Sequence, residues 1–281
     1  MTRKWMIVAV LIIGHAATVW AQDFPTGLNA YVTGDYATAL KVLKPLSNEG
    51  NADAQSILAI MYYEGSGVAH DYQEAIRLAR NSANQGRMVA QHVLGKAYRE
   101  GRGVDRDYSE SIKWYGKAAA QGLSQSQFQL GQFYQLGIGV KRDYAQAVKW
   151  YLLAAPQGDI DAQYALGYLY TNGLGVQMDK FEAAKWYLQA AERGHISSQF
   201  DIGALYFVGS GVAQNHRKAA HWFRMAAQQG HAESQYWLGR MYIDGQGIDE
   251  DPSNRDTGRG WIETASAQGH PAAGELLKSL K

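Results

Sequence analysis

The sequence predicts an all-α fold built as a solenoid of helix-turn-helix repeats. One skeleton recurs every 36 residues over most of the 281-residue chain. Each copy holds two stretches with apolar or small residues at helical spacing. A glycine-rich turn separates these stretches, and a further glycine closes each copy. Self-similarity at such a period is typical of proteins in which stacked helix pairs share one continuous core.

Six full repeats are predicted between degenerate ends. Five of them have 36 residues and the sixth has 39, with the extra three between Gly247 and Trp261. The six span 51–86, 87–122, 123–158, 159–194, 195–230 and 231–269. Residues 22–50 are predicted to form a degenerate N-terminal capping repeat, and residues 270–281 a C-terminal capping helix. Terminal repeats are expected to be atypical because one side of each faces water.

The second repeat shows how each unit is expected to fold. Its first helix runs for about 13 residues and ends at Gly101 and Gly103, which allow positive φ and a sharp reversal. Asp107 is the predicted N-cap of the second helix, and Glu110 completes a capping-box pattern. Gly122 is the expected residue after that helix.

Two proline and glycine features stand out in this scheme. In the sixth repeat Asp251 is the predicted cap, with Pro252 at the first helical position. Pro156 is expected to tighten or kink the last turn of its helix. A glycine also recurs inside the first helix, which predicts close approach of a neighbouring helix, because glycine there costs about 1 kcal/mol against alanine. The sites are Gly95, Gly131, Gly167, Gly203 and Gly239.

The first 21 residues are predicted to be a secretory signal peptide. Arg3 and Lys4 precede an apolar run, Trp5–Ile13, and the small or short residues before Gln22 predict cleavage after Ala21. An uncleaved anchor is the alternative, but the apolar stretch is shorter than the roughly 20 residues that a span needs. The mature chain is therefore predicted to be secreted or periplasmic, with no membrane span.

Composition excludes several classes of function. The chain has 27 basic and 26 acidic residues, so nothing indicates a nucleic-acid surface. Cysteine is absent, which excludes disulfides, thiolate metal sites and a cysteine nucleophile. The motifs G-x-S-x-G, S-x-x-K and H-E-x-x-H are missing, and the G-x-G turns do not follow strands. No catalytic residue, cofactor or metal site is predicted.

The recurring residues resemble a known family. The pattern A-x-x-x-L-G-x-x-Y-x-x-G-x-G-V-x-x-D-x-x-x-A-x-x-W-Y-x-x-A-A-x-Q-G, seen over 51–269, is similar to the Sel-like repeat, a relative of the tetratricopeptide repeat. The resemblance implies a right-handed α/α superhelix and a scaffold or adaptor role in protein–protein interaction. Bacterial members are often secreted or envelope-associated. One cysteine-rich branch is linked to β-lactam binding and hydrolysis, whereas this chain has no cysteine.

Two further columns of polar residues are interpreted as structural. His195, His231 and His270 each follow a closing glycine, and equivalent positions in stacked repeats lie on the order of 10 Å apart, too far to share a metal. They are interpreted as helix-start residues. A glutamine recurs in all six repeats, at Gln55, Gln91, Gln127, Gln163, Gln199 and Gln235. A binding ladder is conceivable, but amides that satisfy backbone groups are the favoured interpretation.

Partner binding is predicted where the repeats differ. One first-helix position holds Ile60, Lys96, Gln132, Tyr168, Ala204 and Arg240, and helical geometry points it away from the core. The turn before it carries His92, Phe128, Tyr164, Phe200 and Tyr236. The predicted partner-binding residues are Lys96, Gln132, Tyr168, Arg240, Phe128, Tyr164, Phe200 and Tyr236. These would line the concave surface that solenoids use for binding. The alternative is that the aromatic residues only pack between repeats.

The sequence thus predicts a secreted or periplasmic, non-catalytic scaffold that is a monomer and binds another protein or peptide. Two other functions stay open. One is a protein that binds or hydrolyses β-lactams or cell-wall compounds, as in the cysteine-rich branch of the family. The other is a structural component of an envelope secretion or polysaccharide complex.

Overall fold

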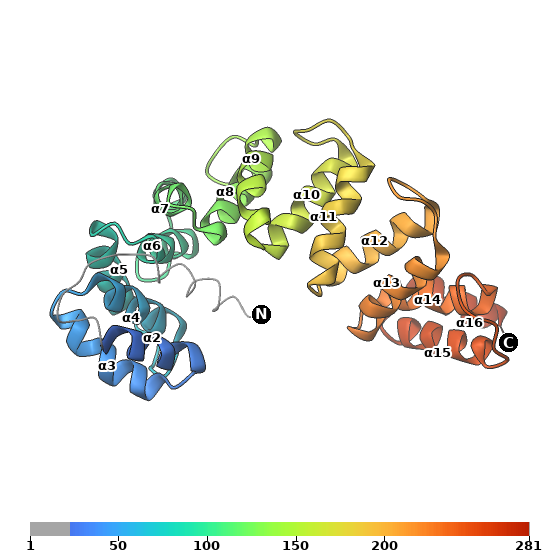
Figure 1. Cartoon of the computed structure of the whole chain (residues 1–281), viewed down its shortest axis with the longest axis horizontal. Coiled ribbons are helices and arrows are strands. Elements are labelled where there is room, and N and C mark those ends of the chain that lie inside the picture. The colour runs from blue at the N-terminus through green and yellow to red at the C-terminus, as the bar shows by residue number, and fades with distance from the viewer. Residues whose placement is uncertain (1–22, 281) are drawn as a thin grey trace. The chain divides into compact units, whose positions relative to one another are not determined.

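The computed structural model describes residues 23–280, and every element within that range is helical (Figure 1). The predicted all-α fold of repeated helix pairs is confirmed. The chain divides into two compact units, one ending at Asp143 and the other beginning at Tyr144, and each is described by itself. The predicted signal peptide lies outside the described residues.

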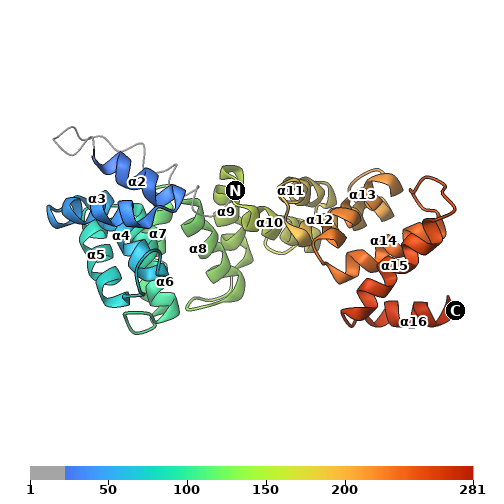
Figure 2. The ribbon, with the colours of Figure 1, turned by 90° about the horizontal axis from the view of Figure 1, so that it is seen from below.

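The first unit is a stack of antiparallel helix pairs in which each helix packs against the next in sequence (Figure 2). Tyr31 and Leu43, from the N-terminal pair, share one hydrophobic cluster with residues of the first two full repeats. Its helices are α2 (Asp23–Thr33), α3 (Tyr36–Asn48), α4 (Ala52–Glu64), α5 (Tyr72–Asn84), α6 (Met88–Glu100), α7 (Tyr108–Ala120) and α8 (Ser124–Leu136).

The second unit continues the same pattern. Pro156 sits in a short 3₁₀ turn, η2 (Ala155–Gln157), which follows α9 (Tyr144–Ala154), so the predicted tightening is confirmed. The remaining helices are α10 (Ile160–Asn172), α11 (Lys180–Glu192), α12 (Ile196–Val208), α13 (His216–Gln228), α14 (Ala232–Asp244), α15 (Asn254–Ala267) and α16 (Pro271–Ser279).

Turns and caps follow the predicted chemistry. Gly101 and Gly103 have φ of 70° and 74°, and Gly122 has φ of 96°. Asp107 caps α7 by accepting from the backbone N–H groups of Ser109 and Glu110 at 2.8 and 3.0 Å. Because only glycine adopts such positive φ at little cost, the sequence marks the ends of the helices directly.

The predicted capping box is wrong in its second half. The Asp107 N–H donates to the Tyr98 carbonyl oxygen at 2.9 Å, so it has no need of a carboxylate acceptor. Glu110 instead pairs with Lys113 one turn further along α7, at 2.9 Å. The packing of α7 against α6 therefore supplies the acceptor that a box would supply in an isolated helix.

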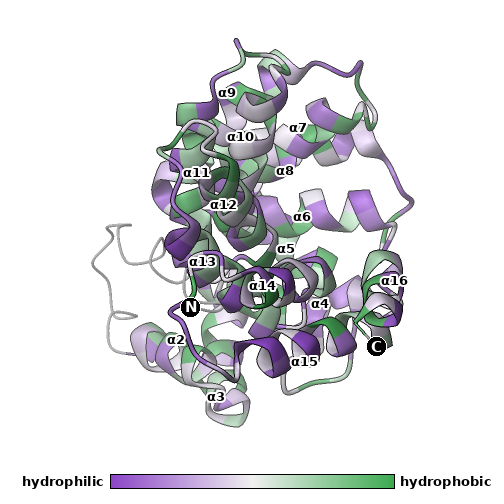
Figure 3. Cartoon of the chain, turned by 90° about the vertical axis from the view of Figure 1, so that its right-hand side faces the viewer, coloured by the Kyte–Doolittle hydropathy of each residue, from purple (hydrophilic) through white to green (hydrophobic). Residues whose placement is uncertain are grey.

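The cap predicted for the sixth repeat is also wrong. The helix α15 begins at Asn254, with Ser253 at the cap position. Asp251 accepts from the backbone N–H and the hydroxyl of Ser253 at 2.7 and 2.6 Å, and Pro252 lies in a turn before the helix. The three extra residues thus lengthen the hydrophilic turn that leads into α15 (Figure 3).

The helix glycines mark close approach between the two helices of one repeat, as predicted. A Cβ built on Gly167 would lie 2.5 Å from the ring of Tyr187 on α11. The same construction on Gly95 gives 2.7 Å to the ring of Tyr115, a fully buried side chain. Gly95 and Gly167 therefore each make room for an aromatic ring that fills the core, whereas Gly239 makes room for Ile262 and the Gly258 carbonyl.

Candidate functional site

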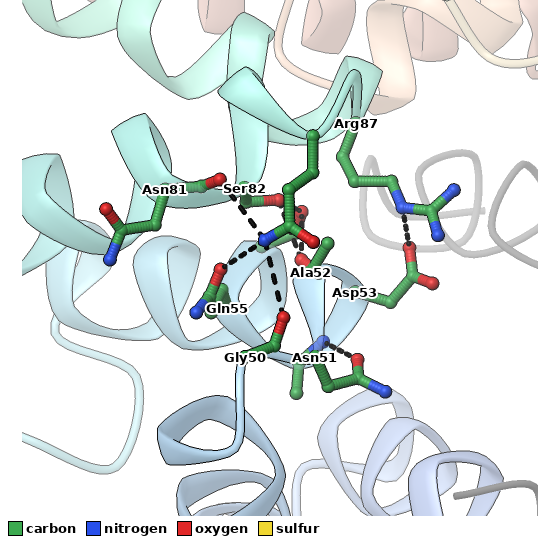
Figure 4. Close-up of polar contacts among 11 residues, drawn as sticks. Gly50, Asn51, Ala52, Asp53, Gln55, Asn81, Ser82 and Arg87 are labelled. Carbon is green, nitrogen blue, oxygen red and sulfur yellow. Dashed lines mark hydrogen bonds and ion pairs between the residues drawn. The ribbon is translucent and has the colours of Figure 1, made fainter. Parts of the chain in front are cut away.

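The glutamine column is structural, as favoured from the sequence. The Gln55 side-chain amide donates to the Ser47 carbonyl oxygen at 3.1 Å. Its Oε1 accepts from the amide of Gln85 at 3.2 Å, and Gln85 also donates to the Gly50 carbonyl oxygen (Figure 4). The Gln55 bond to Ser47 joins the first full repeat to the helix pair before it, and the Gln85 bond to Gln55 joins the two helices of the first repeat. Equivalent side-chain pairs are Gln121 with Gln91, Gln229 with Gln199 and Gln268 with Gln235.

The histidine column is also structural. The Nδ1 atoms of His195, His231 and His270 accept from backbone N–H groups in the first turn of α12, α14 and α16, at 3.1 to 3.2 Å. Burial lowers the pKa of His195 and His231, although Asp161 and Glu233 oppose the shift. An accepting Nδ1 requires a neutral ring. Residues 23–280 hold no cluster of three or more His, Cys, Asp or Glu side chains suited to a metal ion.

Many of the side chains that differ between repeats lie on one surface of the first helices, which we call the first-helix face. It comprises the two side-chain columns that contain Lys96 and Phe128, together with the adjoining column that contains Val93. Tyr168 is 42% exposed, and Lys96, Gln132 and Arg240 are partly exposed. Ile60 occupies the same repeat position but is only 5% exposed, within the cluster that contains Tyr31 and Leu43. The interpretation that this position points away from the core is therefore wrong for Ile60.

The aromatic column of the first-helix face packs between repeats. Phe128 is 7% exposed. The ring of Tyr164 lies 5.8 Å from that of Tyr187 and 4.5 Å from that of His195. The rings of Phe200 and Tyr236 contact the histidine caps His231 and His270 in the same way, at 5.2 and 4.7 Å. Tyr164, Phe200 and Tyr236 stay partly exposed, so they combine a packing contact with an accessible surface.

In the first unit the face contains a pocket, which we call the Lys96 pocket. It is lined by Ile60, Tyr63, Glu64, Val89, His92, Val93, Lys96 and Leu123. The Lys96 ammonium lies 3.4 Å from the Glu64 carboxylate and 5.0 Å from the centre of the Tyr63 ring. The pocket thus has an apolar lining and a rim on which the chain pairs its own charges.

Tyr63 and Glu64 were missed by sequence reasoning. Tyr63 donates to the Glu100 carboxylate at 2.9 Å, and burial and Glu100 raise its pKa. These residues lie outside the two columns that varied most conspicuously. Their register, three and four residues after Ile60, places them on the same side of α4, which is the signal that could have found them.

The equivalent positions in the second unit carry a different set of side chains. Asp201 stands where Val93 stands in the first unit, and Ala204 stands where Lys96 does. Burial raises the pKa of the Asp201 carboxyl to about 6. The other repeats have Ile57, Val93, Gln129, Ala165 and Trp237 at this position, so a carboxylate there is the exception. That single departure from the column is the signal that the sequence offered for Asp201.

Arg240 is the last residue of the Lys96 column along the chain and lies in the second unit. Its guanidinium lies 5.6 Å from the centre of the Trp237 ring and 3.5 Å from the Asp244 carboxylate. Both contacts come from α14 itself, so the cation is held along its own helix. Exposed pairs of this kind contribute little to stability, which leaves the guanidinium free to exchange its partner.

A comparison with protein families shows which family the chain belongs to. The Sel1 repeat model matches residues 52–86, 89–123, 124–159, 160–195, 196–231 and 232–270. The chain belongs to the Sel1 repeat family. The resemblance to Sel-like repeats is thereby confirmed. Sel1 repeats are in general protein-interaction modules.

Two solved structures of Sel1 repeat proteins are similar to the chain. One is c5321, a protective antigen of uropathogenic Escherichia coli with this fold, which is 29% identical over the whole of this chain with a TM-score of 0.85. The chain spans 59% of the length of c5321. The other is a Sel1 repeat protein from Oxalobacter formigenes, 33% identical, which aligns with 86% of this chain and over 98% of its own, with a TM-score of 0.73.

No curated protein matches the chain. Among the described helices, none combines the length and the apolar character needed to cross a membrane. The Sel1 repeats account for the fold, and the first-helix face is a surface on which the repeats of this chain differ from one another.

Proposed function

We propose that the chain is a non-catalytic scaffold that binds a partner polypeptide on its first-helix face. The observation that carries this proposal is how the repeated residues are used. The turn glycines, caps, glutamines and histidines all make contacts within the fold. The side chains that differ between repeats, such as Tyr168 and Arg240, remain accessible. Solenoid proteins use such a face for extended binding.

Several aromatic and basic side chains of the face suit a polypeptide ligand. Tyr168 offers an exposed ring, and Arg240 offers a guanidinium whose partners are the partly exposed Trp237 and the exposed Asp244 of its own helix. Tyrosine and arginine are enriched among the residues that dominate binding energy at protein interfaces. The scaffold is proposed to act as a monomer, because each repeat presents its own share of the face.

The proposed location is the periplasm or the exterior of the cell. This rests on the basic start, apolar run and small residues before Gln22. N-terminal sequencing of the protein recovered from periplasm and medium tests it. Mature protein that begins at Gln22 supports export and cleavage, whereas intact protein retained in the cytoplasm contradicts it.

Site-specific crosslinking tests the binding face. A photoreactive phenylalanine analogue at position 168 is expected to capture a polypeptide, while the same analogue at position 181 captures none. Phe181 is a matched control because it is an exposed aromatic residue on α11, away from the first-helix face. The captured band should disappear in a Tyr168→Ala and Arg240→Ala double variant that carries the analogue at position 164.

The control double variant is Phe181→Ala with Arg217→Ala, which removes an exposed aromatic residue and an exposed arginine elsewhere in the second unit. It should keep the captured band. Equal capture from positions 168 and 181, or equal loss in both double variants, would remove the first-helix face as the binding site.

A further inference from the structure

One carboxylate in the second unit stands in an unusual place. Asp201 is partly buried on α12, at a repeat position where the first unit has the buried Val93. Val93 lines the Lys96 pocket, so Asp201 belongs to the corresponding part of the first-helix face. A carboxylate taken from water costs free energy unless a cation or hydrogen-bond donors compensate it.

The surroundings of Asp201 are aromatic. Burial first, and then the charge of Asp201, raise the pKa of the Tyr164 and Tyr187 hydroxyls, which places both close to the carboxylate. The centres of the Tyr164 and Tyr187 rings lie 5.8 Å apart. The charge of the Tyr168 hydroxyl also raises the pKa of both, so Tyr168 belongs to the same group. Tyr168 is the exposed member of this group. We call Tyr164, Tyr168, Tyr187 and Asp201 the tyrosine–carboxylate cluster.

Residues 23–280 supply no cation to this cluster. Asp201 takes part in no ion pair there, and burial alone accounts for its raised pKa. His195, the cap residue of the helix that carries Asp201, contacts the Tyr164 ring, but its Nδ1 accepts the cap bond and burial lowers its pKa, so it supplies no positive charge. The carboxylate is thus ionised above about pH 6 without a positive partner.

In the first unit, the position equivalent to this cluster has a cation supplied by the chain itself. There Lys96 extends over the Tyr63 ring and pairs with Glu64. In the fifth repeat, which lies in the second unit, alanine stands in place of this lysine at position 204, and an acid stands in place of Val93. The fifth repeat therefore has a carboxylate at this place and no long cationic side chain of its own beside it.

We infer that the tyrosine–carboxylate cluster binds a lysine or arginine side chain of the partner polypeptide. A carboxylate beside tyrosine rings recognises an organic cation by charge pairing together with cation–π contact. The small side chain of Ala204 leaves room for the incoming aliphatic stem. This inference rests on the proposed function and adds the chemistry of the residue that the partner must present.

The test uses four blocked nonapeptides of alternating glycine and alanine that differ only at the centre, which is lysine, arginine, norleucine or glutamate. Binding is followed by NMR of the full chain labelled at Asp carboxyl and Tyr ring carbons. The lysine and arginine peptides are expected to shift the Asp201 carboxyl and Tyr168 ring signals in a saturable way. Their dissociation constants should be at least about tenfold lower than that of the norleucine peptide, since removing the charge removes the ion pair.

Two variants examine the cluster from opposite sides. Asp201→Asn keeps the size of the side chain and should weaken the lysine peptide about tenfold, to the level of the norleucine peptide. Ala204→Lys places a cation of the chain next to Asp201 and should weaken it similarly. Asp249→Asn is the matched control, because it removes a carboxylate that is exposed and pairs with Arg217, and it should leave binding unchanged.

Equal binding of the lysine and norleucine peptides, or equal effects of Asp201→Asn and Asp249→Asn, would overturn the inference. The outcome is separable from that of the proposed function. Capture of a partner at position 168 that survives Asp201→Asn leaves the binding face in place and removes the cation site. Lysine-dependent shifts at Asp201 with no capture at position 168 would keep the cation site and remove the binding face.

Discussion

The first-helix face differs between the two units at positions that correspond in the repeat. In the first unit, Val93 lines a pocket and Lys96 pairs across its rim with Glu64. In the second unit, Asp201 and Ala204 occupy these two positions. The helices and the glycine turns around them are built alike, so the comparison shows that a Sel1 repeat can change the charge of its accessible face without altering its skeleton.

The largest expected effect tests whether the skeleton is shared. Gly95→Leu and Gly167→Leu should each destabilise the fold by more than about 3 kcal/mol, because both side chains would collide with a buried tyrosine ring. The matching alanine variants should cost less, since alanine adds one carbon and gains about 1 kcal/mol of helix propensity. Urea denaturation measures both. Equal midpoints for the alanine and leucine variants would contradict this account of the glycine column.

The next effect concerns the partly buried Asp201 carboxylate of the second unit. The pKa of Asp201 is raised from 3.8 to about 6 in the fold, so its ionisation opposes folding. The cost is absent below about pH 3.8, develops as pH rises towards 6, and is complete above that. Asp201→Asn should therefore stabilise the protein at pH 8, by up to roughly 3 kcal/mol for a shift of about two units.

The stabilising effect of Asp201→Asn should vanish near pH 4. Denaturation midpoints of the two proteins from pH 4 to 8 make the measurement, with Asp249→Asn as an exposed control. A pH-independent difference between Asp201→Asn and the parent would show that ionisation of this carboxyl is not its cause.

A smaller effect comes from the histidine caps of the second unit. The pKa values of His195 and His231 are lowered in the fold, so their contribution is present above about pH 6.5 and is lost as pH falls through the folded values. His195→Asn with His231→Asn keeps a capping oxygen and should remove this loss, about 1 kcal/mol per cap. The comparison is best made in an Asp201→Asn background, because protonation of Asp201 stabilises the fold over an overlapping pH range. An unchanged pH dependence would argue against the caps as its source.

The smallest effect is expected at the cation of the first unit. Lys96→Ala removes a partly exposed ion pair and should cost less than about 1 kcal/mol. It should also open the rim of the Lys96 pocket, which can be followed by the exchange-averaged NMR signals of the Val93 methyl groups. A cost of several kcal/mol would mean that the pair is structural, and the contrast with Ala204 would lose its functional meaning.

Much of the fold could be predicted because its signals are local. The positive φ of Gly101 and Gly103, the cap at Asp107 and the 3₁₀ turn at Pro156 each follow from what one residue can do with its own backbone. The errors arose where a longer contact intervened. The Tyr98 carbonyl took the N–H that Glu110 was expected to accept, and Asp251 bound Ser253 in place of starting a helix.

The candidate site was predictable only in part. Repeat register identified the columns of Lys96 and Phe128, but register does not set exposure. Phe128 is nearly buried while Tyr168 is open to solvent, and Ile60 shares its repeat position with Tyr168 yet lies in the core. Tyr63, Glu64 and Asp201 entered the site only when neighbouring helices brought them to it.

The sequence by itself determined the repeat, its turns and its caps, because these depend on backbone conformation within a few residues. Tertiary structure decided which of the equivalent side chains are accessible and which carboxylate is partly desolvated. Burial and pKa depend on the helices packed around a residue, and these come from adjacent repeats. For that reason Val93 and Asp201 could be matched by counting residues, whereas the raised pKa of Asp201 and its tyrosine surroundings could not.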